Sequence, residues 1–228
     1  MNSGFKAKIT PIDRIQENLV ARIERRVLNW LCARLPRWVT PDMLTGTGIV
    51  GAFMVFGGYA GSNVDRNWLW LAVAGYLVHW LGDSLDGSLA RFRKIERPRY
   101  GYFLDHSCDG FATTLLVVGI GLTPYVELEA ALIALAGYLL MSIHAFLSVR
   151  VLGELRLSYL NAGPTELRMV LIALTVCMYA AGREPPLIGA LNVFDLFVGG
   201  VGICLIALFL VQTRRIAARL AKEEPPRN

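Results

Sequence analysis

The sequence predicts an all-α integral membrane protein, in which six transmembrane helices follow an amphipathic helix that lies at the membrane surface. The first reason is composition: 54% of the 228 residues are hydrophobic and 18% are charged, and the mean hydropathy is +0.46. Soluble domains rarely reach that value. The second reason is a series of six long apolar stretches, and the third is an uneven distribution of Lys and Arg between the links that join them.

The N-terminal segment, residues 1–39, contains the pattern of an amphipathic helix. Thr10, Pro11 and Asp13 form a helix start, with an N-cap, a proline at the first helical position and an acid in the first turn. Apolar residues then recur in three- and four-residue steps, at Ile12, Ile15, Leu19, Ile23, Val27, Trp30 and Leu35. We therefore expect a helix in the cytoplasmic membrane interface, with a soluble partner-binding helix as the alternative. The segment has no export-signal pattern, so we expect no removable signal peptide.

Six stretches are long enough to cross a bilayer, for which roughly 20 mainly apolar residues are needed. Together they form a membrane domain over 40–215, followed by a cytoplasmic tail over 216–228. The expected spans are 42–61, 67–91, 100–123, 128–150, 164–182 and 193–213. The uncharged run of the second span is too short by itself. It crosses the membrane only if the helix continues through Asp83 and Asp86, and the third span likewise requires Gly101 to Asp109 to be helical.

The basic residues predict the orientation of these spans. Of the 23 Lys and Arg residues, only Arg66 and Arg183 fall in links on one side. The others lie in the N-terminal segment, in the links after the second and fourth spans, and at the C-terminus. Both termini and the aspartate-bearing helix ends should therefore face the cytoplasm. The net charge of +5 fits contact with anionic membrane lipids, and it does not indicate nucleic-acid binding because the basic residues flank spans.

Four aspartates stand out against the apolar background. At about 100° per residue, one face of the second span carries Asp83, Asp86, Gly87, Ala90 and Arg91, and one face of the third carries Gly101, Asp105 and Asp109. If the two faces meet, four carboxylates and one guanidinium converge. Ionised carboxylates at membrane depth need counter-charges. Oxygen ligands select hard cations, and four carboxylates suit two bridged Mg²⁺ or Mn²⁺ ions.

The cysteines do not indicate a different kind of metal site. The four cysteines are Cys32, Cys108, Cys177 and Cys204, and no two of them have the spacing of a zinc site or of a disulfide framework.

Gly87 and Gly101 remove side chains beside the expected metals, so that a phosphate or a nucleotide ring can approach the backbone.

The aspartate pattern as a whole resembles the signature of the CDP-alcohol phosphotransferase family. The matching residues are Asp83-x-x-Asp86-Gly87-x-x-Ala90-Arg91, followed by Gly101-x-x-x-Asp105-x-x-x-Asp109. The segment Thr40-Pro41-Asp42-Met43-Leu44-Thr45 is also similar to the one that opens the first span in this family. The resemblance implies transfer from a CDP-linked donor to a hydroxyl acceptor, with release of CMP. It also implies a site at the cytoplasmic membrane edge and allows a homodimer.

The resemblance further implies roles for individual residues. Asp83, Asp86 and Asp105 would be metal ligands, and Asp109 would complete the metal site and accept the proton of the attacking hydroxyl. Nucleotide contacts would come from Asp42, Thr45, Gly87, Ala90, Arg91 and Gly101. The segment around His106 is similar to one in choline and ethanolamine phosphotransferases, whose acceptor is a lipid hydroxyl, so His106 is a second candidate for the base. Glu166 and Arg168, at the start of the fifth span, are candidates for binding the acceptor.

Three alternatives remain open from the sequence. The donor and acceptor can exchange roles, so that CDP-diacylglycerol transfers its phosphatidyl group to a soluble alcohol or alcohol phosphate, although we favour a lipid acceptor. Intramembrane acids also mark ion pathways, so a divalent-cation transporter is the alternative outside enzymes. An intramembrane prenyltransferase would also use acid-rich helices with Mg²⁺-pyrophosphate.

Overall fold

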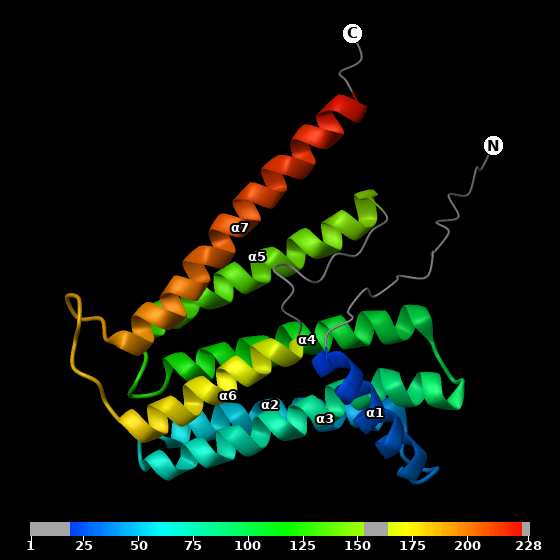
Figure 1. Ribbon diagram of the computed structural model, residues 1–228, viewed down its shortest axis with the longest axis horizontal. Coiled ribbons are helices and arrows are strands. Elements are labelled where there is room, and N and C mark those ends of the chain that lie inside the picture. The colour runs from blue at the N-terminus through cyan, green and yellow to red at the C-terminus, as the bar shows by residue number, and fades with distance from the viewer. Residues whose placement is uncertain (1–18, 153–163, 225–228) are drawn as a thin grey trace.

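A computed structural model describes residues 19–152 and 164–224, and within these ranges the chain is helical and contains no β-strand (Figure 1). A short 3₁₀ turn, η1 (Arg66–Trp68), precedes α3. The helices are α1 (Leu19–Arg34), α2 (Pro41–Gly61), α3 (Leu69–Arg93), α4 (Pro98–Gly121), α5 (Leu128–Leu152), α6 (Pro164–Ala181) and α7 (Val193–Glu223).

The helices begin where the sequence places starting signals. Thr40 caps α2, because its hydroxyl accepts a hydrogen bond from the Met43 amide at 3.2 Å, and Pro41 is the first helical residue. Asn192 and Asp195 form a reciprocal capping box at the start of α7. The start predicted for the N-terminal helix, at Thr10 and Pro11, lies outside the described residues.

Both expectations about the aspartate-bearing spans are confirmed. Asp83 and Asp86 belong to the same helix as the apolar run before them, α3, and Gly101 to Asp109 lies within α4. The last helix differs from the prediction. We expected a span ending at 213 and a separate tail from 216, but α7 continues without a break to Glu223. The segment Thr213 to Glu223 has no proline or glycine that would stop the helix, and it ends with charged side chains in the last turns.

The closest helix pair in the molecule is α2 and α3, and small residues make this approach possible. A Cβ atom on Gly82 would lie 2.2 Å from the Gly48 backbone nitrogen, and one on Gly51 would lie 2.3 Å from the His79 nitrogen. Glycine at both positions lets the two backbones touch, as at other membrane helix interfaces. The first turns of α2 and the aspartate-bearing turns of α3 are thereby held side by side.

Helices α1, α4 and α6 pack against this pair. Figure 1 shows α4 and α6 alongside α2 and α3, whereas α5 and α7 form a second pair that diverges from them toward the C-terminus. A buried hydroxyl chain joins three helices: Tyr59 of α2 is 3.1 Å from the Tyr76 hydroxyl of α3 and 2.7 Å from the Thr175 hydroxyl of α6. Such a satisfied network inside the apolar core fixes how these helices are aligned.

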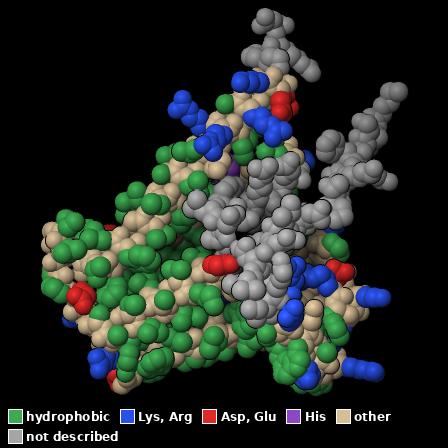
Figure 2. All heavy atoms as spheres, viewed as in Figure 1, with side chains coloured by type: hydrophobic (Ala, Val, Ile, Leu, Met, Phe, Trp, Pro, Cys, Tyr) green, Lys and Arg blue, Asp and Glu red, His purple; other side chains and the backbone are tan. Residues whose placement is uncertain are grey.

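Successive helices run in opposite directions, so the links gather at two ends. At one end, Asn63 donates to the Leu122 carbonyl at 2.7 Å and Asn192 donates to the Tyr125 carbonyl at 2.9 Å. At the other end, the Arg93 guanidinium donates to four backbone carbonyls between residues 35 and 39, at 2.6 to 3.4 Å. Figure 2 shows Lys and Arg side chains mainly around α1, the α3–α4 link and the end of α7, with hydrophobic side chains over much of the rest of this face.

Three of the six long helices that the structure describes, α2, α5 and α7, are long and apolar enough to cross a membrane by length and composition. The other three, α3, α4 and α6, carry charged residues within the turns that a span requires. The prediction of six spans is therefore supported in part. The chain is a membrane protein, and α3, α4 and α6 are the helices with polar ends.

Helix α1 lies against α3 through a small apolar cluster. Leu28 and Cys32 of α1 are buried against Leu85 and Leu89 of α3. Other apolar side chains of α1, Val27 and Trp30, point away from the protein and are exposed. The helix thus has apolar residues on two sides, one of which the protein covers.

Candidate active site

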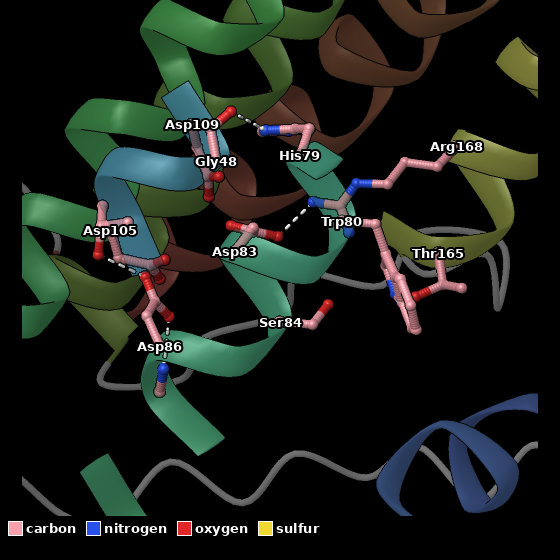
Figure 3. A network of polar contacts seen from close by, with 12 residues as sticks. Gly48, His79, Trp80, Asp83, Ser84, Asp86, Asp105, Asp109, Thr165 and Arg168 are labelled. Carbon is pink, nitrogen blue, oxygen red and sulfur yellow. Dashed lines mark hydrogen bonds and ion pairs between the residues drawn. The ribbon is translucent and has the colours of Figure 1, made fainter. Parts of the chain in front are cut away.

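The four predicted aspartates come together in one pocket between α2, α3 and α4. The pocket is lined by Thr45, Gly48, Ile49, His79, Asp83, Asp86, Asp105, Cys108 and Asp109. Figure 3 shows Asp83 and Asp86 reaching from α3, and Asp105 and Asp109 from α4, toward the same space. The two helical faces identified in the sequence therefore meet, and the close contact of α2 with α3 supplies the third wall.

Asp83 is paired with a guanidinium from another helix. Its carboxylate accepts a hydrogen bond from Arg168, which lies one turn into α6, and both side chains are largely buried, at 21% and 12% exposed (Figure 3). From the sequence we expected the guanidinium of Arg91 to converge with the carboxylates. The structure instead places Arg91 beside Gly87 and Ser88, outside the pocket lining. The expectation that the Arg91 guanidinium meets the carboxylates was therefore wrong. Residue spacing places Arg91 on the helical face that carries the aspartates, but it does not determine where a long side chain points.

Asp86 is held by neutral donors. The Thr45 hydroxyl donates to one carboxylate oxygen at 2.6 Å, and the Gly87 amide donates to the other. Thr45 lies in the first turns of α2 and enters the pocket because α2 and α3 are in contact there. A carboxylate with a hydrogen bond to each oxygen has its orientation fixed, as a preorganised metal ligand requires.

Asp105 and Asp109 lie on either side of His106 along α4. The His106 Nδ1 atom is 3.5 Å from an Asp105 oxygen and 3.7 Å from an Asp109 oxygen. Its ring packs on Tyr102 of the preceding turn and on Phe146 of α5, with centroid distances of 4.3 and 5.3 Å. His106 is thus next to the pocket rather than in its lining, and its Nε2 atom is buried without a hydrogen-bond partner.

The other sequence candidates are not part of the pocket lining. Asp42 forms an exposed ion pair with Arg97 and accepts a hydrogen bond from Tyr100 at 3.4 Å. Open space surrounds the position of a Cβ on Gly101, whereas one on Gly87 would lie 3.3 Å from the Arg91 guanidinium. Ala90 and Glu166 are half-buried on α3 and α6.

Four lining residues were not predicted for the site: Gly48, Ile49, His79 and Cys108. His79 was interpreted as an ordinary interior histidine, and its Nδ1 atom does donate a hydrogen bond to the Gly48 carbonyl at 3.0 Å. It also lies four residues before Asp83, on the same helical face, and this spacing was a usable signal. Cys108 was interpreted as a packing residue, and it contributes to the lining between Asp105 and Asp109.

The residues present suit divalent cations. The lining offers four carboxylates, and Asp105, His106 and Asp109 each have a ligand atom within 4.8 Å of the others. Carboxylate oxygens select hard ions, whereas thiolates and clustered imidazoles select softer ones. Four carboxylates this close also repel one another unless cations neutralise them.

Comparisons with known proteins point in the same direction. A family model described as CDP-alcohol phosphatidyltransferase matches residues 38–212. Cholinephosphotransferase 1 of Danio rerio is 30% identical over 97 residues, 40% of this chain and 25% of that protein. Phosphatidylinositol phosphate synthase of Cutibacterium acnes is 33% identical over 99 residues, 42% of this chain and 45% of that protein.

A third similar protein is the archaetidylinositol phosphate synthase of Methanothermobacter thermautotrophicus, which is 31% identical over 101 residues, 44% of this chain and 49% of that protein. The matches thus span from a quarter to about half of the length of these relatives.

Proposed function

Because the chain belongs to the CDP-alcohol phosphatidyltransferase family, we propose that it transfers a phospho-alcohol or phosphatidyl unit from a CDP-linked donor to a hydroxyl acceptor. The acceptor oxygen forms a bond to the phosphorus distal to cytidine. The bond from that phosphorus to the bridging oxygen breaks, and CMP leaves. The observation that carries the proposal is the pocket in which four carboxylates from two helices meet.

In this proposal Asp83, Asp86, Asp105 and Asp109 hold two divalent cations, Mg²⁺ or Mn²⁺. When bound, the cations would supply charge stabilisation for the pyrophosphate and for the leaving phosphate. Thr45 orients the Asp86 carboxylate through its 2.6 Å hydrogen bond. Arg168 neutralises part of the carboxylate charge through Asp83.

The donor nucleotide would bind at the open edge of the pocket. Gly101 leaves open space beside the backbone of α4, Gly87 gives room to the Arg91 guanidinium beside α3, and Ala90 keeps the same wall low. Arg91 next to Gly87 and Asp42 at the start of α2 complete the proposed nucleotide contacts, together with Thr45. The exposed Asp42–Arg97 pair must then rearrange when the nucleotide binds, which is inexpensive because surface ion pairs contribute little.

The proton of the acceptor hydroxyl would pass to Asp109, with His106 close enough to assist. The His106 Nδ1 atom lies 3.5 Å from an Asp105 oxygen and 3.7 Å from an Asp109 oxygen, so a small shift of the ring would bring it within hydrogen-bonding distance of either carboxylate. We favour a lipid hydroxyl as acceptor. Arg168 next to Asp83 supports the second candidate, transfer from CDP-diacylglycerol to a soluble alcohol or alcohol phosphate, because a guanidinium binds a phosphate dianion well.

We also propose that α2 to α7 all cross the membrane and that both termini and the pocket face the cytoplasm. The charges of α3, α4 and α6 then lie at their cytoplasmic ends, where insertion costs less than at mid-bilayer. A homodimer is compatible with this arrangement. All four pocket aspartates lie at one end of the bundle, which argues against the alternative of a cation transporter.

The direct test is replacement of each pocket carboxylate by its amide. Asp83→Asn, Asp86→Asn, Asp105→Asn and Asp109→Asn keep the side-chain volume but remove the charge that cations require. Each should lower the rate of CMP release from CDP-linked donors by more than about 100-fold, since even outer-shell partners of metal ligands are worth 10–100-fold. Chelation of divalent ions from the wild type should produce the same loss.

Asp65→Asn is the matched control, because Asp65 caps η1 at the opposite end of the bundle. It should retain the rate of CMP release. Membrane insertion and thermal stability should be measured for every variant, so that loss of activity is separated from loss of fold. Near-normal CMP release in two of the four pocket variants would disprove the two-cation site.

A further inference from the structure

One carboxylate on α1 joins three helices. Glu24 accepts a hydrogen bond from the Trp80 indole nitrogen at 2.9 Å and from the Ser84 hydroxyl at 3.3 Å, both on α3. It also contacts the Thr165 hydroxyl of α6, which lies 3.1 Å from each carboxylate oxygen. Three donors from two other helices thus meet on one side chain, and charge-assisted hydrogen bonds of this kind are stronger than neutral ones.

The partners of Glu24 lie directly beside the pocket. Ser84 follows Asp83 in sequence, and Thr165 lies one helical turn before Arg168, the residue that donates to Asp83. Figure 3 shows Thr165 and Arg168 on neighbouring turns of α6, with Trp80 between Thr165 and α3. The start of α6 is therefore attached to α3 at two points, once through Arg168 and Asp83 and once through Glu24.

Helix α1 is packed against α3, which fixes the position of Glu24. Leu28 and Cys32, one and two turns further along, are buried against Leu85 and Leu89 of α3. The Arg93 guanidinium also holds the backbone that follows α1, through hydrogen bonds to the carbonyls of residues 35 to 39. Because α1 is fixed on α3 at several points, the hydrogen bond between Glu24 and Thr165 also fixes the start of α6 relative to α3.

We propose that Glu24 is a positioning residue, which fixes the first turn of α6 and thereby places Arg168 against Asp83. The N-terminal amphipathic helix is then part of the catalytic apparatus as well as a membrane contact. The inference has a functional half and a structural half. The functional half, the effect of Glu24 on turnover, rests on the proposed function. The structural half, the attachment of α6 to α1 by Glu24, does not depend on any reaction.

The structural half is tested by amide hydrogen exchange on the whole protein in detergent or nanodiscs. Glu24→Ala and Thr165→Val each remove the α1–α6 hydrogen bonds. They should accelerate exchange in peptides from the first two turns of α6 by roughly 5–30-fold, the effect of losing 1–2 kcal/mol of local stability. Glu24→Gln keeps one acceptor oxygen and should give an intermediate value. Arg26→Ala, an exposed change on the same helix, should leave α6 exchange unchanged.

The functional half is tested by a double-mutant cycle on kcat/KM for CMP release. If Glu24 acts through Arg168, Glu24→Ala should lower kcat/KM by roughly 5–30-fold in the wild-type background but by less than about twofold when Arg168 is already Gln. The same loss in both backgrounds would show that Glu24 does not act through Arg168, and would overturn this half of the proposal.

The two measurements distinguish the failures. Unchanged α6 exchange in both Glu24→Ala and Thr165→Val would disprove the inference, whatever the kinetics. A wild type that releases no CMP from any CDP-linked donor would instead disprove the proposed function, while faster α6 exchange in the two variants would still support the role of Glu24 in positioning α6.

Discussion

Each of the four pocket aspartates has a different immediate partner, and these partners suggest different tasks. Asp83 is neutralised by a guanidinium and Asp86 is oriented by a hydroxyl and an amide. Asp105 and Asp109 share the neighbourhood of one imidazole. In the proposed function, these different surroundings suit the carboxylates to different tasks: a charge-balanced ligand, a preorganised ligand and a proton acceptor.

At the residue scale, His106 and Arg168 distinguish the two acceptor classes. With a lipid hydroxyl as acceptor, His106→Ala should lower kcat by roughly 10²–10⁴-fold, the usual effect of a positioned acid–base group. Arg168→Ala should then leave the acceptor KM nearly unchanged, although its contact with Asp83 predicts a lower kcat. Steady-state kinetics with a diacylglycerol acceptor and a CDP-alcohol donor make the comparison.

With a soluble alcohol phosphate as acceptor, the pattern should be reversed. Arg168→Ala would remove a cation that binds the phosphate dianion, and the acceptor KM should rise strongly, while His106→Ala should have a mild effect. The same two variants should therefore be assayed with CDP-diacylglycerol and soluble alcohol phosphates. A mild His106→Ala effect beside a large rise in acceptor KM for Arg168→Ala would rule out our preference for a lipid acceptor.

At the scale of elements, the pocket depends on the contact between α2 and α3. The helices approach so closely that a Cβ on Gly58 would lie 2.4 Å from the Ala72 backbone nitrogen, whereas a Cβ on the neighbouring Gly57 meets no atom within 4 Å. These adjacent glycines on one helix are therefore a matched pair for testing whether backbone contact holds the bundle.

Gly58→Ala should destabilise the protein by about 1–3 kcal/mol, because the clashing atoms belong to the backbone and cannot move aside independently. Gly57→Ala should be neutral or slightly stabilising, since alanine is the better helix former by about 1 kcal/mol. Thermal unfolding of the two purified variants in the same detergent gives the comparison. Equal melting temperatures would contradict the close α2–α3 contact.

At the scale of the whole molecule, polar groups are concentrated at the end of the bundle that carries the pocket. Arg93, Arg97 and the Asp83–Arg168 pair all lie toward that end, whereas the links at the other end contain only Arg66 and Arg183 among the basic residues. Val27 and Trp30 of α1 add exposed apolar side chains near the polar end, as expected for a helix that contacts the membrane interface.

This asymmetry predicts the membrane orientation. In a variant without native cysteines, Val64→Cys and Glu184→Cys should react with an impermeant maleimide added to intact cells. Glu96→Cys and Lys222→Cys should react only after the membrane is permeabilised, because the positive-inside rule places their links in the cytoplasm. Labelling of Glu96→Cys in intact cells would place the pocket on the wrong side of the membrane for a cytoplasmic CDP-linked donor.

Much of this organisation is visible in the amino-acid sequence. The places of the helices follow from apolar runs, and the helix starts follow from caps such as Thr40 with Pro41. Helical periodicity, a local property of the chain, places Asp83 and Asp86 on one face of their helix and Asp105 and Asp109 on one face of theirs. The family signature rests on the same residues, and for that reason it was recognisable without any knowledge of the fold.

The neighbours of those residues were decided by the tertiary structure. Residue spacing assigned Arg91 to the carboxylates, but the guanidinium on Asp83 comes from Arg168, 85 positions away in the chain. Glu24 similarly meets Thr165 across 141 positions. Periodicity defines the face of a helix on which a side chain lies, but it contains no information about which other helix packs against that face. That choice depends on the packing of the whole bundle, in which the glycines of α2 and α3 allow backbone contact and the Glu24 carboxylate of α1 meets both Trp80 of α3 and Thr165 of α6.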